Sequence, residues 1–207
     1  MDTPLALVIT DLPTVPRAEL LGRLERARSL PPELRGRLAV QLRDPELATD
    51  ELHALGRELR ALTRELGASL VVNDRLDLAL ELEADGLHLG RRSLGVDEVR
   101  SRVGNRLWIS VSCHGPGELA VAAAAGPDAV LLSPVFASPR KREPLGLMAL
   151  PEAKSALPPS VALLALGGVT VERAAACVRA GADGVAAIRA DLVAALPRIA
   201  AERRLGP

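Results

Sequence analysis

The chain has 207 residues, with 26 basic and 26 acidic side chains, so its formal net charge is zero. It contains one tryptophan, one phenylalanine and no tyrosine. This composition argues against the basic surfaces and base-stacking side chains that hold nucleic acids, and against the basic patches that bind anionic membranes.

No apolar run in the sequence reaches the length of a transmembrane helix, and the N-terminus lacks the basic and then apolar pattern of a secretory leader. The two cysteines, Cys113 and Cys177, are too few for a disulfide framework and have no metal-ligand spacing around them. We therefore expect a soluble cytoplasmic protein without nucleic-acid or membrane partners. A homo-oligomer is compatible with these features.

Short apolar runs alternate along the chain with longer segments that carry Leu and Ala at helical spacing. The runs predict eight strands, at residues 5–10, 38–43, 69–73, 86–89, 107–112, 129–133, 161–166 and 184–188. The clearest helical segments are residues 17–29, 46–66, 117–125, 170–180 and 191–202, with shorter ones at 76–82 and 95–103.

Strands that alternate with helices predict βαβ units and a parallel sheet. Eight units fit a closed (β/α)8 TIM barrel of the α/β class, and no break in composition divides the chain, so we expect one domain over residues 1–207. Asp85, Asp128 and Asp183 each follow a helix-ending turn and precede a strand, which predicts structural roles on the face opposite the active site.

In such a barrel the chemistry lies where the strands end and the following loops begin. Gly167 and Gly168 follow the seventh strand, and a second small-residue turn, residues 181–186, comes one unit later. Glycines let backbone N–H groups approach a ligand, and the helix behind them adds further N–H groups. The tandem turns predict a phosphate grip; the alternative is two ordinary tight turns.

Two long polar side chains, Gln41 and Arg43, share one face of the second strand. Burying them is costly unless they meet a ligand or each finds a partner. Arg43 could fork onto a phosphate or carboxylate, or it could close the barrel mouth with an acidic neighbour.

The third and fourth strands end on further polar residues. Asp74 could ligate Mg²⁺, or it could cap the following helix while Asn73 braces the turn. His88 lies mid-strand on the same face as two glycines, which fits a ligand-contacting histidine and a packed core histidine equally well.

The fifth strand places Ser110, Ser112 and His114 along one line. Ser112 can offer its hydroxyl to an anion, and His114 is at the mouth, where a group that titrates near neutral pH can serve as acid or base. The alternative for His114 is a helix-start residue. After the sixth strand, a basic, turn-rich loop with Ser138 and Lys141 can fold over an anionic ligand.

These residues, in this order, resemble the thiamine-phosphate synthase and TenI (thiazole tautomerase) family. The resemblance spans nearly the whole chain and is carried by residues 41–43 (QLR), 72–80 (VNDRLDLAL), 84–90 (ADGLHLG), 110–114 (SVSCH), 133–136 (SPVF), 167–170 (GGVT) and 181–186 (GADGVA).

The resemblance implies a role for each matching residue. In the synthase branch, a diphosphate would be held by Gln41, Arg43, Asn73 and Lys141, magnesium by Asp74, and a thiazole phosphate by Gly168 and the segment around Ile188.

The chain departs from the synthase pattern at several of these positions. Pro45 stands where the family has a lysine, Arg189 where it has a serine, and Ser138 and Arg140 where it has two threonines. The run from Gly90 through Arg91 and Arg92 to Ser93 lacks the family's second acidic ligand.

The departures favour a TenI-type thiazole tautomerase, which binds a small-molecule thiazole phosphate and needs no cofactor. In that interpretation His114 moves the proton, and Arg189 helps the glycine turns to hold the phosphate. The alternatives are a divergent, Mg²⁺-dependent thiamine-phosphate synthase that joins a hydroxymethylpyrimidine diphosphate to a thiazole phosphate, and an inactive thiazole-phosphate-binding or regulatory homologue.

Overall fold

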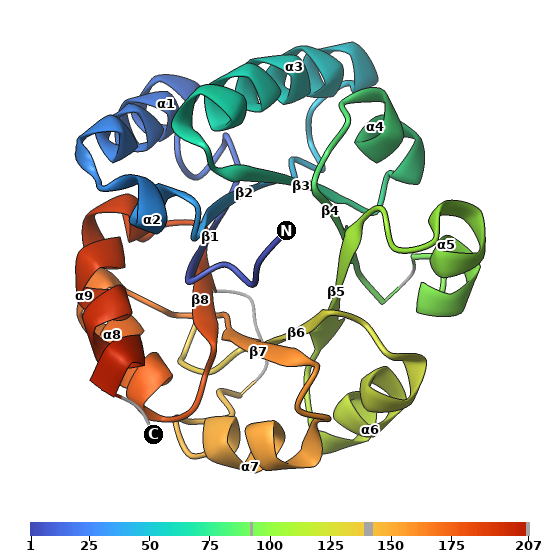
Figure 1. Cartoon of the computed structure of the whole chain (residues 1–207), viewed down its shortest axis with the longest axis vertical. Coiled ribbons are helices and arrows are strands. Elements are labelled where there is room, and N and C mark those ends of the chain that lie inside the picture. The colour runs from blue at the N-terminus through green and yellow to red at the C-terminus, as the bar shows by residue number, and fades with distance from the viewer. Residues whose placement is uncertain (92, 139–142, 206–207) are drawn as a thin grey trace.

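Parallel strands close into a barrel in their order along the chain, and the last strand pairs with the first through Ala6 and Val185 (Figure 1). The computed structural model describes residues 1–91, 93–138 and 143–205. The strands are β1 (Ala6–Ile9), β2 (Leu38–Leu42), β3 (Ser69–Asn73), β4 (Gly86–Leu89), β5 (Trp108–Cys113), β6 (Ala129–Leu132), β7 (Ala162–Ala165) and β8 (Gly184–Ala187). The predicted TIM barrel is therefore confirmed.

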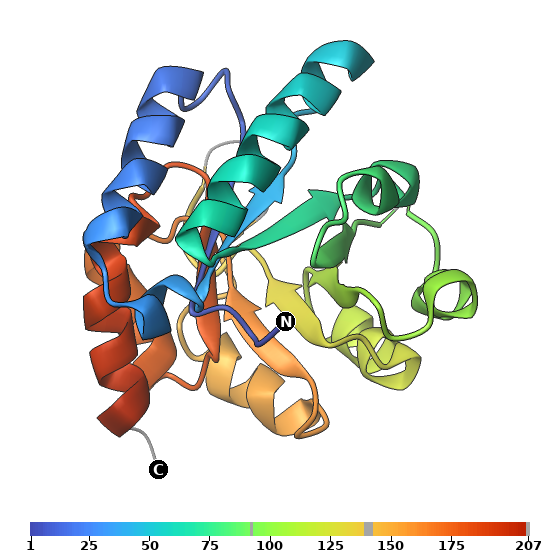
Figure 2. The ribbon, with the colours of Figure 1, turned by 45° about the horizontal axis from the view of Figure 1, so that its top comes forward.

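Helices surround this barrel on the outside (Figures 1 and 2). They are α1 (Arg17–Glu25), α2 (Pro32–Arg35), α3 (Thr49–Leu66), α4 (Leu76–Glu81), α5 (Val96–Val103), α6 (Pro116–Ala125), α7 (Ala149–Ala156), α8 (Val171–Arg179) and α9 (Leu192–Leu205). A 3-10 turn, Arg26–Ser29, completes the segment predicted as the first helix, while α2 and α7 are additional to the predicted segments.

The longest helix, α3, shows why these segments are helical. Leu55, Leu59, Leu62 and Leu66 recur every three or four residues and are buried, so they form one apolar stripe against the barrel. Gly67 ends the helix at φ +69°, a left-handed conformation that suits glycine at a helix C-terminus. None of the described helices is long and apolar enough to cross a membrane.

Alternating residues of the strands fill the barrel interior. The apolar part of this filling consists of Leu7, Ile9, Ala39, Val71, Trp108, Ala129, Leu131, Ala162, Leu164 and Ala186. Trp108 begins β5 and is buried at the amino end of the barrel, where a Cβ on Gly86 would lie 2.8 Å from the Trp108 carbonyl oxygen. The amino end is thus closed by packing.

The three aspartates that precede β4, β6 and β8 have the predicted structural role. Each carboxylate accepts the N–H of the second residue of the preceding strand and pairs with basic side chains: Asp85 with Leu70 and Arg60, Asp128 with Ile109 and Arg100, and Asp183 with Leu163, Lys154 and Arg203. The repeat ties neighbouring strands and an outer helix together at the amino end of the barrel.

Asp183 is the most enclosed of the three, with a side chain 9% exposed. Burial alone would raise its pKa, but the hydrogen bonds from Lys154 and Leu163, with the charges of Lys154 and Arg203, outweigh burial and hold that pKa below its ordinary value. The carboxylate therefore stabilises the fold above the pKa of an unfolded aspartate, and this contribution is lost as the pH falls through the lowered pKa.

We predict that Asp183→Asn lowers the free energy of unfolding at pH 7 by about 2 kcal/mol, because it removes the enclosed carboxylate that pairs with the half-buried Lys154 and the exposed Arg203. Urea denaturation measures the loss. The deficit should shrink as the pH falls from about 4, near the pKa of an unfolded aspartate, through the lowered pKa of the folded Asp183 carboxylate.

The matched control is Asp85→Asn, whose carboxylate is 32% exposed and meets one cation. Its effect should be less than half as large. Equal losses for the two variants would contradict the special role of Asp183.

Candidate active site

Parallel strands bring the predicted site residues to one end of the barrel. Arg43 follows β2, Asn73 ends β3, His114 follows β5, Gly167 lies just beyond β7, and Ile188 follows β8. Because every strand points the same way, all five positions surround the carboxyl mouth of the barrel, where TIM-barrel enzymes place their active sites.

The interior of the barrel becomes polar on one side as it approaches this mouth. Gln41, Asn73, His88, Ser110 and Ser112, here called the interior polar cluster, come from the adjacent strands β2 to β5. The register pairs Asn73 with His88 and His88 with Ser110, so these side chains lie side by side on the inner face. The polar side of the mouth thus runs from β2 to β5.

A chain of hydrogen bonds orders the first part of this cluster. Gln41 Nε2 donates to Asn73 Oδ1 at 3.0 Å, and Asn73 Nδ2 donates to Asp74 Oδ2 at 2.7 Å. Gln41 is 1% exposed, and its Oε1 is buried without a partner among the described residues. Buried acceptors are normally hydrogen-bonded, so Gln41 Oε1 is suited to accept a hydrogen bond from a ligand.

Asp74 is exposed at the mouth and links the loops after β3 and β4. Its Oδ1 accepts the Gly90 N–H at 3.0 Å and the Ser93 hydroxyl, and its backbone lies at φ +60°. The alternative that Asp74 caps α4 is wrong, since Arg75 occupies the cap position without a side-chain cap. Ser93 was not singled out from the sequence, because the contact joins residues 19 apart.

Asp74 would offer a metal ion a single carboxylate. Within residues 1–91, 93–138 and 143–205 there is no group of three His, Cys, Asp or Glu side chains that could hold a metal ion. Mg²⁺ often binds proteins through one or two carboxylates, with water and substrate phosphates as its other ligands. Asp74 therefore fits a magnesium ion that arrives with a diphosphate and does not form a closed metal site by itself.

Arg43 is a cation without a counter-ion in the described part of the chain. Its backbone is held by Thr10, whose hydroxyl bonds both the N–H and the carbonyl of Arg43 at about 3 Å. The adjacent Asp44 forms no ion pair with Arg43; its Oδ2 accepts the Leu12 N–H at 2.6 Å, and its Oδ1 is buried without a partner among the described residues. The guanidinium is therefore available to an anion.

His88 lies below the mouth, 4% exposed, between two serines. Its Nδ1 is 2.9 Å from Ser110 Oγ, and its Nε2 is 2.9 Å from Ser112 Oγ. Burial lowers the pKa of His88 to about 4; the charge of Asp74 acts in the opposite direction and that of Arg43 in the same direction. This geometry favours a packed core histidine, whose influence on a ligand passes through Ser112.

His114 stands at the mouth in a defined orientation. Its Nδ1 donates to the Ser133 carbonyl at 2.8 Å, so the neutral ring carries its proton there and leaves Nε2 as an acceptor. Its backbone N–H donates to Glu118 at 2.7 Å, and Glu118 also lies 3.8 Å from Arg91. Glu118 was missed in the sequence, although an acidic residue in the first turn of α6 is a helix-start signal.

The two glycines after β7 are required because the backbone of the segment after β6 passes close to them. Gly167 and Gly168 lie at φ +91° and +63°, and a Cβ on Gly167 would come within 2.6 Å of Pro134 Cα. A Cβ on Gly168 would come within 2.5 Å of the Ala137 carbonyl oxygen. The pair therefore lets the segment after β6 cross the turn, a reason for glycine additional to the predicted phosphate grip.

The eighth strand contributes one apolar and one basic residue. Ile188 is half-buried and packs on the apolar interior, while Arg189 is exposed. The Arg189 carbonyl accepts a hydrogen bond from Arg23 Nη1 at 2.8 Å, which fixes the backbone after β8. In the described structure the Arg189 side chain has no carboxylate partner.

The basic loop after β6 is described only in part. Ser138 is half-buried. Arg140 and Lys141, together with Arg92 after β4, lie outside the described residues. Their predicted contacts with a ligand stay predictions.

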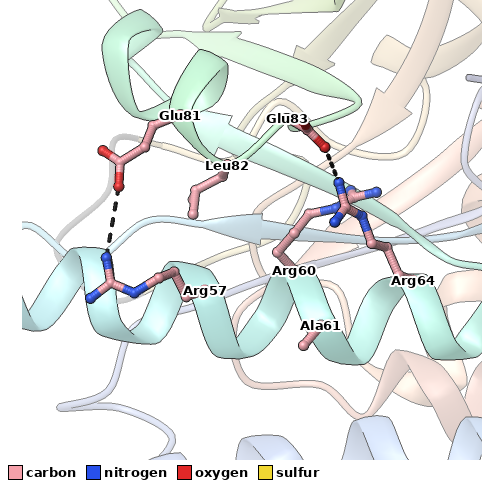
Figure 3. Close-up of a pocket in the computed structure, with 7 residues that line it drawn as sticks. All are labelled: Arg57, Arg60, Ala61, Arg64, Glu81, Leu82 and Glu83. Carbon is pink, nitrogen blue, oxygen red and sulfur yellow. Dashed lines mark hydrogen bonds and ion pairs between the residues drawn. The ribbon is translucent and has the colours of Figure 1, made fainter.

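A cavity of about 330 Å³ lies away from the mouth, on the outer wall between α3 and the end of α4 (Figure 3). Its charged residues have ion-pair partners: Arg57 lies 3.7 Å from Glu81, Arg64 is bonded to Glu83, and Arg60 pairs with Asp85 outside the cavity. None of the predicted site residues lines it. We assign it to packing between the two helices.

Comparison with known proteins identifies the family to which this barrel belongs. The family model described as thiamine monophosphate synthase matches residues 7–190. The chain belongs to this family, the thiamine-phosphate synthase and TenI family.

Several relatives support the family assignment. The thiamine-phosphate synthase of Moorella thermoacetica is 39% identical over 173 residues, covering 82% of this chain and 81% of the relative. The thiamine-phosphate synthase of Methanoregula boonei is 41% identical over 165 residues, covering 76% of each chain. A solved thiamine phosphate pyrophosphorylase from Pyrococcus furiosus superposes with a TM-score of 0.77 at 28% identity, covering 97% and 95% of the two chains.

The family places the chain in thiamine biosynthesis and indicates an enzyme. The names of the relatives favour the synthase, which the sequence motifs left as the alternative, over the tautomerase, which they put first. The departures at Pro45, at Arg189 and in the run from Gly90 to Ser93 are therefore differences within a family whose similar members are named synthases.

The buried position of His88 generates a direct test. We predict that its ring signals in a histidine NMR titration stay in the neutral position from pH 8 to about 5.5 and move with a midpoint near the lowered pKa of about 4. Because this pKa is below that of an unfolded histidine, the fold should also lose stability as the pH falls from about 6.5 to 4. A midpoint near 6.5 would contradict the buried, doubly bonded ring.

Proposed function

We propose that this chain is a thiamine-phosphate synthase, which joins a hydroxymethylpyrimidine diphosphate to a thiazole phosphate and releases pyrophosphate. The observation that carries the proposal is the bonded chain from Gln41 through Asn73 to Asp74, together with Arg43, which has no ion pair among the described residues. It gives the mouth a second anion-binding side, separate from the glycine turn. A tautomerase of one monophosphate needs only the glycine turn and an acid–base residue.

The polar side of the mouth suits the diphosphate substrate. Arg43 can fork onto phosphate oxygens, and the free Oε1 of Gln41 can accept a hydrogen bond from the pyrimidine. When Mg²⁺ is bound, Asp74 would hold it, and its charge would stabilise the departing pyrophosphate.

The reaction breaks the bond between the pyrimidine methylene carbon and the diphosphate oxygen, which leaves with the electron pair. The lone pair of the thiazole nitrogen then forms the new carbon–nitrogen bond. Positive charge develops on the pyrimidine and negative charge on the leaving group, so cations fixed beside the diphosphate lower the barrier. Arg43 is such a cation, and Lys141 has this role by resemblance.

The other side of the mouth suits the thiazole phosphate. The Gly168 N–H has no acceptor in the described part of the chain, and Arg189 follows β8, the strand that pairs with β7, without an ion pair among the described residues. A backbone donor and a cation form a subsite for a phosphate dianion. Ile188, half-buried beside them, offers apolar contact to the thiazole ring.

One observation favours the tautomerase as a second candidate. The Ser133 carbonyl accepts from His114 Nδ1, so in the neutral ring the other nitrogen, Nε2, can accept a proton, as a general base does. A tautomerase would use this nitrogen to take a proton from the thiazole and return it at another atom. In a synthase the same ring would serve binding.

We predict that the purified chain, supplied with both synthase substrates and Mg²⁺, releases pyrophosphate, and that Asp74→Asn raises the Mg²⁺ concentration for half-maximal rate by about tenfold or more. Asparagine keeps the acceptor for the Gly90 N–H, so the loop should hold. The measurement is coupled pyrophosphate release during a Mg²⁺ titration.

Asp77→Asn is the matched control, because Asp77 lies in the first turn of α4 and pairs with Arg75. Its Mg²⁺ requirement should equal that of the wild type. Tautomer formation without pyrophosphate release would overturn the synthase, and tight thiazole-phosphate binding without either turnover would favour the inactive homologue.

A second variant separates the two enzyme candidates. We predict that His114→Ala abolishes any thiazole tautomerisation while the affinity for thiazole phosphate, measured by calorimetry, stays within about threefold. Pyrophosphate release should fall much less than tautomerisation. Tautomerisation that survives the substitution would show that His114 is not its base.

A further inference from the structure

Arg173 lies in the first turn of α8 and bridges two loops at the mouth. Its Nη1 donates to the Gly168 carbonyl at 3.0 Å, and its guanidinium carbon lies 4.8 Å from the centroid of the Phe136 ring. Its own backbone N–H donates to the Thr170 hydroxyl at 3.3 Å, which fixes the base of the side chain. One side chain thus contacts both the glycine turn and the segment after β6.

The charge of Arg173 is unusual for its position. The amino end of a helix carries partial positive charge, so a cation in the first turn is disfavoured there unless something compensates it. Within the described residues Arg173 has no carboxylate partner, and what it contacts is a carbonyl oxygen and an aromatic ring. The guanidinium is therefore compensated by the carbonyl, the ring and the charge of the neighbouring Glu172, and its contacts join two loops of the mouth.

The hydrogen bonds of the glycine turn define which way its peptide units face. Gly167 O accepts the Phe136 N–H at 2.9 Å, and Gly168 O accepts from Arg173. In a trans peptide the carbonyl and the next N–H point in opposite directions. Since both carbonyls are held toward Phe136 and Arg173, the N–H groups of Gly168 and Val169 face away from them.

These two N–H groups have no acceptor in the described part of the chain. Successive backbone N–H groups that face one way form a concavity for an anion. We propose that Arg173 is a positioning residue for the phosphate subsite: by holding the Gly168 carbonyl it orients the Val169 N–H, and by stacking on Phe136 it fixes the turn against the segment after β6. The proposal rests on the proposed binding of thiazole phosphate at this turn.

The first test is kinetic. Arg173→Met, which keeps the length of the side chain and removes its donors, should raise the KM for thiazole phosphate about tenfold while kcat and the KM for the diphosphate change less than about twofold. Arg173→Lys, which restores a charge and a donor without the planar stack, should recover the KM to within about threefold of wild type.

The matched control is Arg179→Met, in the last turn of the same helix, where Arg179 pairs with Glu202. All three kinetic constants should match those of the wild type. A purely structural Arg173 would lower the melting temperature of Arg173→Met with no selective change in the KM for thiazole phosphate, and that result would overturn the proposal.

A double-mutant cycle that combines Arg173→Met with Phe136→Leu tests whether the contact between the guanidinium and the ring matters. If Arg173 and Phe136 act as one unit, the double variant should raise the KM for thiazole phosphate no further than Arg173→Met alone, so the two effects are not additive. Additive effects would overturn the part of the proposal that assigns a role to the ring.

The second test observes the turn directly and separates this proposal from the assignment of the substrate. In the wild type, thiazole phosphate and inorganic phosphate should each shift the backbone amide signals of Gly168 and Val169, and the Arg173→Met variant should need about tenfold more of either probe. If inorganic phosphate shifts these amides with the tenfold difference between the two proteins and thiazole phosphate shifts none, the proposed function fails and the role of Arg173 stands. Equal affinities in the two proteins, or no amide shift with either probe, would overturn the role of Arg173.

Discussion

The side-chain amide of Gln41 donates a hydrogen bond to the side-chain oxygen Oδ1 of Asn73. This bond joins two neighbouring strands at the level where the barrel interior changes from apolar to polar. A polar group in a packed interior is stable only when it is bonded, so this pair commits both side chains to one orientation. Asn73 then has its amide nitrogen left for Asp74, and Asp74 in turn holds the loop after β4. The partly buried bond thus contributes, with Gly90 and Ser93, to the orientation of the Asp74 carboxylate at the mouth.

The mouth has two chemically different halves as a result. On the β2–β5 side, side chains supply the polar groups, whereas beyond β7 the backbone supplies them, because the crossing of the Ser133–Ala137 segment leaves no room for side chains on Gly167 and Gly168. Side-chain groups can change one at a time, and Pro45, where the resemblance implies a lysine, lies on this side of the mouth. The glycine turn is tied to backbone packing and is harder to change.

Much of this architecture could be predicted from the sequence, because it depends on local patterns. Alternation along each strand placed Gln41 and Arg43 on one face, and the position of Asp183 before a strand predicted its structural role. The contacts of Ser93, Glu118 and Arg173 could not be predicted in the same way. Each depends on where loops from separate strands meet, and Arg173 resembles any other surface cation on an amphipathic helix until its neighbours are known.

The scarcity of aromatic residues has an experimental consequence. Trp108 is the only tryptophan, the chain has no tyrosine, and the indole is buried at the amino end of the barrel, 6% exposed. Near-ultraviolet fluorescence from this protein therefore comes from a single ring on the floor of the barrel, far along the strands from the mouth. Its emission therefore reports folding of the barrel with little interference from events at the ligand site, so the stability of the protein can be measured by fluorescence with ligand present or absent.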